Sequence, residues 1–130
     1  MKQITTLFSL LLMLVLVNGC QSSSGTSAKM DDGLKSLPLA KVEDTVSATG
    51  EVEVKLEIHN KSAEGIKVFW VDYDGFKTQW RGIIKPGGVE LCDVSFATHV
   101  WLITNSKEEP LGIYVLPEKD SKIIYRKKAD

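Results

Sequence analysis

The sequence is poor in the residues from which small proteins build disulfide or metal-bound frameworks. Its 130 residues include only two cysteines, Cys20 and Cys92, and two histidines, His59 and His99. Two cysteines cannot form a disulfide framework, and a four-ligand zinc site needs closely spaced Cys and His pairs. We therefore expect a fold held by a hydrophobic core, with no metal and no cofactor.

Neither positively nor negatively charged residues are in excess. There are 16 Lys and Arg residues against 17 Asp and Glu, which leaves a formal net charge of −1. A general nucleic-acid binder needs a basic surface to neutralise phosphates, so nucleic acid is not expected as a partner. The apolar fraction of 43% is enough for a core, and the length suits one ordinary domain.

Long apolar runs are also missing, apart from a short one near the N-terminus. Lys2 precedes an apolar stretch from Leu7 to Val17, which is shorter than the roughly 20 residues that a transmembrane helix needs. A cationic start, a short apolar centre and small residues after it are typical of a secretory signal. We expect residues 1–19 to be a signal peptide that is removed from the mature chain.

The residues Val17-Asn18-Gly19-Cys20 end this segment. They resemble the lipobox of bacterial lipoproteins, in which cleavage precedes a cysteine that carries a diacylglycerol. The resemblance implies that Cys20 is lipidated and that the protein is anchored in a bacterial cell envelope, with its domain in the periplasm or outside. Gln21 stands where an inner-membrane retention aspartate would stand, which favours the outer membrane. The alternative is an ordinary secretory signal with an incidental cysteine.

The segment after the cysteine is polar and rich in serine. Gln21–Lys29 has the composition of a flexible tether. Gly33 and Pro38 interrupt any periodicity in the stretch that follows, so its structure is left open and residues 20–48 are grouped as lipidated cysteine and tether. The domain itself is expected at residues 49–130.

From Gly50 onward the apolar residues follow a period of two. Val52, Val54, Leu56 and Ile58 alternate with polar residues, as in a strand that buries one face. Six further short runs, separated by turn residues, span 66–73, 76–84, 89–95, 99–104, 111–116 and 122–125. No helical periodicity of useful length appears. The pattern predicts an all-β fold, a seven-stranded antiparallel β-sandwich.

The residues for covalent catalysis are few. Cys92, Asp93 and His99 contain a thiol and a base, but their spacing does not place them within reach of one another. A buried thiol and a structural or binding histidine explain the same residues, because an unpaired cysteine usually behaves as a small hydrophobe. No phosphate-binding loop or nucleotide motif is present, so we do not expect an enzyme.

The aromatic residues are more informative. Trp70, Trp80 and Trp101 fall on three different predicted strands, and His99 and Trp101 share a face because they are two residues apart. Such tryptophans either fill the core or line a groove with an apolar wall and a few polar groups. Composition alone supports both interpretations equally.

Four runs carry a family resemblance. They are Ile58-His59-Asn60-Lys61-Ser62, Val68-Phe69-Trp70-Val71-Asp72-Tyr73-Asp74-Gly75, Pro86-Gly87 and Ser95-Phe96-Ala97-Thr98-His99-Val100-Trp101. Their order and spacing resemble the β domain of the von Hippel–Lindau tumour suppressor, over roughly residues 48–126. In that family the β domain is a seven-stranded sandwich that binds an extended peptide carrying 4-hydroxyproline.

The resemblance also implies a ligand site. Trp70 and Trp101 would form aromatic walls, and Ser95 and His99 would hydrogen-bond the proline hydroxyl. Trp80 stands where the family has a tyrosine that lines the pocket. An aromatic ring therefore stays in the pocket wall, but the phenol hydroxyl is absent. The expected partner is a peptide or protein ligand, hydroxylated in the family's manner.

Two functions stay open at this point. The first is a membrane-anchored module that recognises an extended peptide or a small hydroxylated ligand through the aromatic, serine and histidine groove. The second is a structural or accessory envelope lipoprotein whose tryptophans are core and which has no small-ligand site. The helical domain through which the tumour suppressor joins a ubiquitin ligase has no counterpart in the sequence, so ubiquitin-ligase subunits are not expected as partners.

Overall fold

The computed structural model describes residues 32–127. The expected signal peptide, the lipidated Cys20 and the tether up to residue 31 lie outside the described residues. Within them the fold is all-β, with one 3-10 turn, η1, at Leu39–Lys41. In this range no helix has the length and apolar character needed to cross a membrane.

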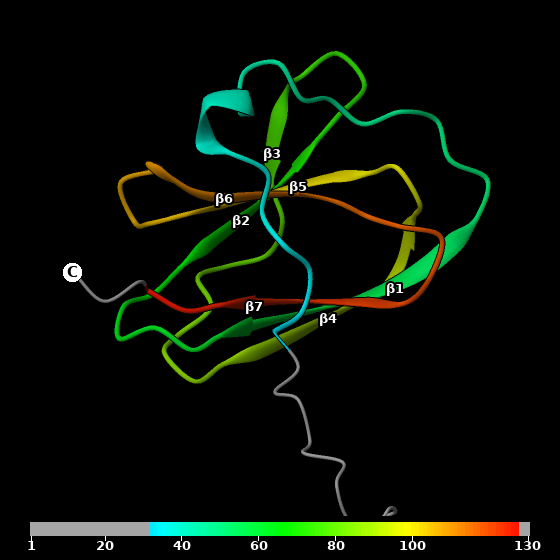
Figure 1. The fold of residues 1–130 in the computed structure, drawn as a ribbon. Helices are drawn as coiled ribbons and strands as arrows, with labels where there is room; N and C mark the ends of the chain where they lie inside the picture. Colours follow the sequence, from blue (N-terminus) through cyan, green and yellow to red (C-terminus); the bar gives the residue numbers. More distant parts are fainter. Residues whose placement is uncertain (1–31, 128–130) are drawn as a thin grey trace, which may run out of the picture. The chain divides into compact units, whose positions relative to one another are not determined.

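Residues 32–127 contain seven strands in two sheets. The strands are β1 (Glu53–Asn60), β2 (Lys67–Val71), β3 (Lys77–Gln79), β4 (Val89–Phe96), β5 (Val100–Thr104), β6 (Pro110–Val115) and β7 (Ser121–Tyr125). One sheet has the order β4-β1-β7 and the other the order β3-β2-β5-β6. Figure 1 shows the first sheet in the lower part of the domain and the second above it. The predicted β-sandwich is confirmed.

The core lies between the sheets, and β1 shows how the sequence pattern builds it. Val54, Leu56 and Ile58 are at most 2% exposed, as their alternation predicts, and burying each such side chain contributes about 1.5–3 kcal/mol. Val52 was expected on the same face but is 41% exposed. Its carbonyl accepts the amide of Ala97, and β1 begins only at Glu53, so the pleat does not extend to Val52.

One strand pair departs from the predicted antiparallel arrangement. β7 runs parallel to β1, with Leu56 opposite Ser121 and Asn60 opposite Tyr125. The other pairs in the two sheets are antiparallel. The sequence could not show this difference, because alternation of apolar and polar residues is the same for both strand directions.

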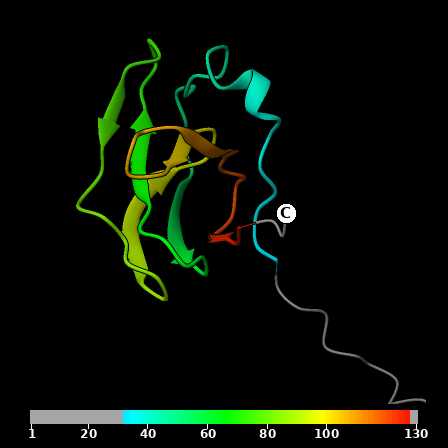
Figure 2. The same cartoon turned by 90° about the vertical axis from the view of Figure 1, so that its left-hand side faces the viewer.

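The segment of residues 32–48 belongs to the sandwich. The amide of Leu34 donates to a β7 carbonyl at 2.7 Å, and that of Leu37 to a β6 carbonyl at 2.8 Å. The buried Ser47 hydroxyl bridges β2 and β5 by donating to a β2 carbonyl and accepting a β5 amide. In Figure 2 the cyan part of this segment runs beside β6 and β7. The expected boundary at residue 49 is therefore corrected, since open strand edges supply partners that periodicity cannot reveal.

Candidate functional site

The residues expected to bind a ligand come together in the structure. Trp70 on β2, Trp80 after β3, Ser95 on β4, His99 before β5 and Trp101 on β5 line one pocket of about 230 Å³. Its lining comes from β2 and β5 of one sheet, from β4 of the other, and from the residue after β3, so the pocket lies between the two sheets. One local difference is that Trp80 follows β3 instead of lying within a strand of residues 76–84.

Aromatic rings form the wall of this pocket. Trp70 and Trp101 are directly opposite on antiparallel strands, so their side chains share a face. Trp80 meets Trp101 edge-on, with ring centroids 5.6 Å apart. Trp101 is only 3% exposed, whereas the other two are half-buried. Trp101 thus serves the core and the pocket at once. The Arg81 guanidinium covers the outer side of Trp80 at 4.7 Å.

A β-bulge directs Ser95 into the pocket. Cys92 and Ser95 both line it although they are three residues apart, a spacing that puts side chains on opposite faces of a regular strand. β4 has two residues, Asp93 and Val94, where β1 has one, and this extra residue reverses the alternation. Without the bulge the serine hydroxyl would face solvent.

The β4–β5 turn fixes the position of His99. Thr98 has a φ of 72°, and the amide of His99 donates to the Phe96 carbonyl at 3.1 Å. The Tyr73 hydroxyl lies 3.1 Å from His99 Nε2. Burial lowers the pKa of His99 below its usual range, so the ring is neutral at neutral pH.

Two polar atoms remain for a ligand. Trp101 Nε1 donates to Ser95 Oγ at 3.2 Å, which leaves the serine proton without an acceptor among residues 32–127. His99 Nδ1 makes no hydrogen bond within the same range. When His99 Nε2 donates to Tyr73, Nδ1 is an acceptor, so the pocket offers one donor and one acceptor.

A third polar atom of the wall is buried without a partner. Within the described part of the chain, Trp70 Nε1 has no hydrogen-bond partner. A buried unpaired donor costs on the order of 1–3 kcal/mol. Such groups are uncommon in native structures.

Sequence reasoning missed part of the site. The rings of Tyr73 and Phe96 pack against His99 with centroids 5.8 and 5.4 Å away, and Val94 also lines the pocket. Tyr73 stands in the run that carries the resemblance, but only the pairing of β2 with β5 brings it to His99. No sequence signal marks that contact.

Cys92 is buried, as expected from its sequence. Its thiol donates to the Val94 carbonyl at 3.3 Å, and burial is the main cause that raises its pKa. Within residues 32–127 no hydrogen bond joins Cys92 to His99. The thiol therefore stays protonated, which does not favour a nucleophilic role.

The pocket has the chemistry of a small aromatic box with a few hydrogen-bonding groups. Among residues 32–127 no three His, Cys, Asp or Glu side chains are grouped so as to hold a metal ion. A ligand for this pocket would combine an apolar body with a single polar group. Comparison of the chain with protein-family models and with curated proteins finds no match.

Proposed function

We propose that the protein is a membrane-anchored binding module, and that its pocket takes a small ring with one hydroxyl, presented by an extended peptide. The observation that carries this proposal is the meeting of Ser95 and His99 inside one aromatic pocket. The resemblance of residues 48–126 to the von Hippel–Lindau β domain supports the same assignment. Hydroxyproline fits both the chemistry of the pocket and the ligand that the resemblance implies.

The size of the pocket and its polar atoms both suit such a group. About 230 Å³ is below the 300–1,000 Å³ of sites for drug-sized ligands, so it suits one side chain and not a folded peptide. Ser95 can donate to the ligand hydroxyl while His99 Nδ1 accepts from it. A site built in this way rejects the ligand that lacks the hydroxyl, because its own polar groups would stay unpaired.

The rest of an extended peptide has a place along β4. Among the described strands β4 pairs with β1 alone, so its outer edge is open to an added strand. Val89, Leu91 and Val94 on β4 are between 40% and 58% exposed. Backbone pairing along this edge would give affinity, while the pocket selects the hydroxylated side chain.

The hydroxyl-reading role is tested with two single variants of the full chain. Ser95→Ala and His99→Ala are each expected to weaken binding of a hydroxyproline peptide by about 1–3 kcal/mol, the penalty of an unpaired buried polar group. Binding of the matching proline peptide should be weak in the wild type and unchanged in the variants. Calorimetry with both peptides measures the effect, and thermal melts show whether the fold is kept.

Matched controls lie outside the pocket. Ser121→Ala on β7 and His59→Gln on β1 remove the same side-chain types and should leave peptide binding unchanged. If the wild type binds neither peptide, or binds both equally, the proposal fails. The second function, a structural or accessory envelope lipoprotein with no small-ligand site, would then be preferred, and the low exposure of Trp101 favours it. Unfolding of His99→Ala would identify His99 as a core residue.

The anchor is a separate part of the proposal. Val17-Asn18-Gly19-Cys20 supports acylation of Cys20 and attachment to the bacterial outer membrane. Metabolic labelling with palmitate is expected to tag the wild-type chain and not Cys20→Ser. Equal label in both proteins would contradict the anchor without affecting the pocket.

A further inference from the structure

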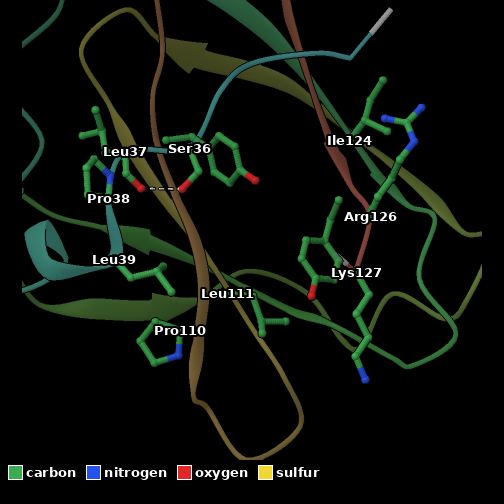
Figure 3. Close-up of a pocket in the computed structure, with 11 residues that line it drawn as sticks. Ser36, Leu37, Pro38, Leu39, Pro110, Leu111, Ile124, Arg126 and Lys127 are labelled. Carbon is green, nitrogen blue, oxygen red and sulfur yellow. Dashed lines mark hydrogen bonds between the residues drawn. The ribbon is translucent and has the colours of Figure 1, made fainter. Parts of the chain in front are cut away.

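A second pocket lies at the opposite edge of the sandwich, between the end strands β6 and β7. Its volume is about 670 Å³, and the segment of residues 36–39 forms one side of it. Figure 3 shows Leu37, Pro38 and Leu39 on this side, with Arg126 and Lys127 across from them. The hollow is therefore apolar at one end and cationic at the other.

A buried phenol in this pocket lacks a partner. Tyr114 is 5% exposed and lines the pocket, yet within residues 32–127 its hydroxyl makes no hydrogen bond. The nearby Ser36 hydroxyl is occupied, since it donates to the Leu37 carbonyl at 2.7 Å and accepts the Ile113 amide at 3.0 Å. Burial, with a smaller effect of Tyr125, raises the pKa of Tyr114. The phenol thus stays protonated and is available as a donor.

The two cations are held loosely. Arg126 lies 3.7 Å from Asp32, and Lys127 lies 4.0 Å from Glu64. Both carboxylates are at least 70% exposed and belong to residues outside the pocket lining. Exposed ion pairs of this kind contribute little to stability, so a ligand anion can take the place of either carboxylate at low cost in free energy. Among the described residues, no acidic side chain lines the pocket.

We propose that this pocket is a second binding site, which takes an anionic amphiphile. Its carboxylate or phosphate meets Arg126 and accepts the Tyr114 hydroxyl proton, with Lys127 adding positive charge nearby, while its acyl chain lies on the apolar residues of 37–39. A neutral ligand would leave the cations unused, and a purely polar one would leave the leucines and prolines in water. The volume lies within the range of small-molecule sites. This proposal does not depend on the function proposed for the first pocket.

The test uses the full chain with Cys20→Ser, which removes the expected acyl anchor. Decanoate and decyl phosphate, both below their micelle concentrations, are the anionic probes, and decanol is the neutral one. Calorimetry should show that the anions bind at least about tenfold more tightly than decanol. Amide NMR shifts should fall on Ser36, Leu37, Leu39 and residues 111–114, and the indole signals of Trp70 and Trp80 should stay in place.

Variants separate the head group from the apolar wall. Tyr114→Phe keeps the ring and should weaken decanoate binding about tenfold, as expected for one hydrogen bond to a charged group. Arg126→Gln should weaken it several-fold. Leu39→Glu, at a position that is 49% exposed, should abolish it. Lys85→Gln, which removes a cation on the β3–β4 connection, is the matched control and should bind as the wild type does.

A membrane lipid and a free acid share this chemistry, and vesicles distinguish them. Binding to phosphatidylglycerol vesicles but not to phosphatidylcholine, lost in Arg126→Gln, would assign the site to membrane lipid. Binding of decanoate without vesicle binding would assign it to a free acid. Equal affinity for decanol, absence of any binding, shifts confined to the tryptophan pocket, or an unaffected Leu39→Glu would each overturn the proposal.

Discussion

Replacement of Asn60 by alanine is expected to lower the free energy of unfolding by about 3–5 kcal/mol. Asn60 is fully buried, and its side chain makes four hydrogen bonds. Nδ2 donates to the carbonyls of Glu64 and Ile84 at 2.7 and 2.9 Å. Oδ1 accepts from the amide and the hydroxyl of Ser62 at 3.0 and 2.6 Å. Removing the side chain breaks all four bonds at once and leaves a cavity at a fully buried position, and urea denaturation would measure the loss.

A second asparagine provides the matched control. Asn105 lies in the β5–β6 turn, and its Oδ1 accepts the amides of Lys107 and Glu109, both at 2.9 Å. These groups can turn to water when the side chain is removed, so Asn105→Ala should cost only about 1 kcal/mol. A loss in Asn60→Ala no larger than that in Asn105→Ala would show that the buried network is not a main support of the fold.

The Asn60 network also explains one of the sequence runs that carry the resemblance. The run Ile58–Ser62 ends β1, and Asn60 ties the loop after it to Ile84 before β4. None of its residues lines the tryptophan pocket. This run therefore specifies the scaffold, whereas the runs that contain Trp70, Ser95 and His99 supply the pocket.

Much of the fold could be predicted from local patterns, because each pattern has a local physical cause. Alternation in β1 identified Val54, Leu56 and Ile58 as core residues. The parallel direction of β7 and the docking of residues 32–48 could not be predicted, since both depend on which distant strand edge is open. The end of the alternation at Val52 depends on a contact with Ala97, which is equally distant in sequence.

The same limit applies to the site. The tryptophans, Ser95 and His99 could be named from their order in the sequence, and the structure brings them together. The bulge that turns Ser95 inward could not be predicted, because the residue pattern of β4 is that of a regular strand. The contact of Tyr73 with His99 arises only from strand pairing. The pocket at Tyr114 carries no motif at all, since its lining comes from three separate parts of the chain.

Replacement of Trp101 by alanine is expected to damage both the fold and the proposed binding. Trp101 is 3% exposed, packs on Trp80, and donates to Ser95. In the register of the sheet it lies opposite Trp70 on one side and Tyr114 on the other. Loss of a buried indole costs about 3–5 kcal/mol, a large share of the stability of a small domain. Urea denaturation measures this loss, and peptide binding should be abolished.

Two companion variants separate the packing of Trp101 from its hydrogen bond. Trp101→Phe keeps an aromatic ring but removes the N–H that donates to Ser95 Oγ together with the second ring of the indole. We expect a loss of at least about 1–2 kcal/mol in stability, smaller than that of Trp101→Ala, together with weaker discrimination between hydroxyproline and proline peptides. Trp80→Ala removes a half-buried wall residue with no hydrogen bond to Ser95. It should reduce binding while costing less stability than Trp101→Ala, because its ring is already partly in water. If Trp80→Ala and Trp101→Ala lose equal stability and neither affects peptide binding, the rings serve packing alone. A Trp101→Phe variant that discriminates as the wild type does would show that the serine hydroxyl is oriented without the indole.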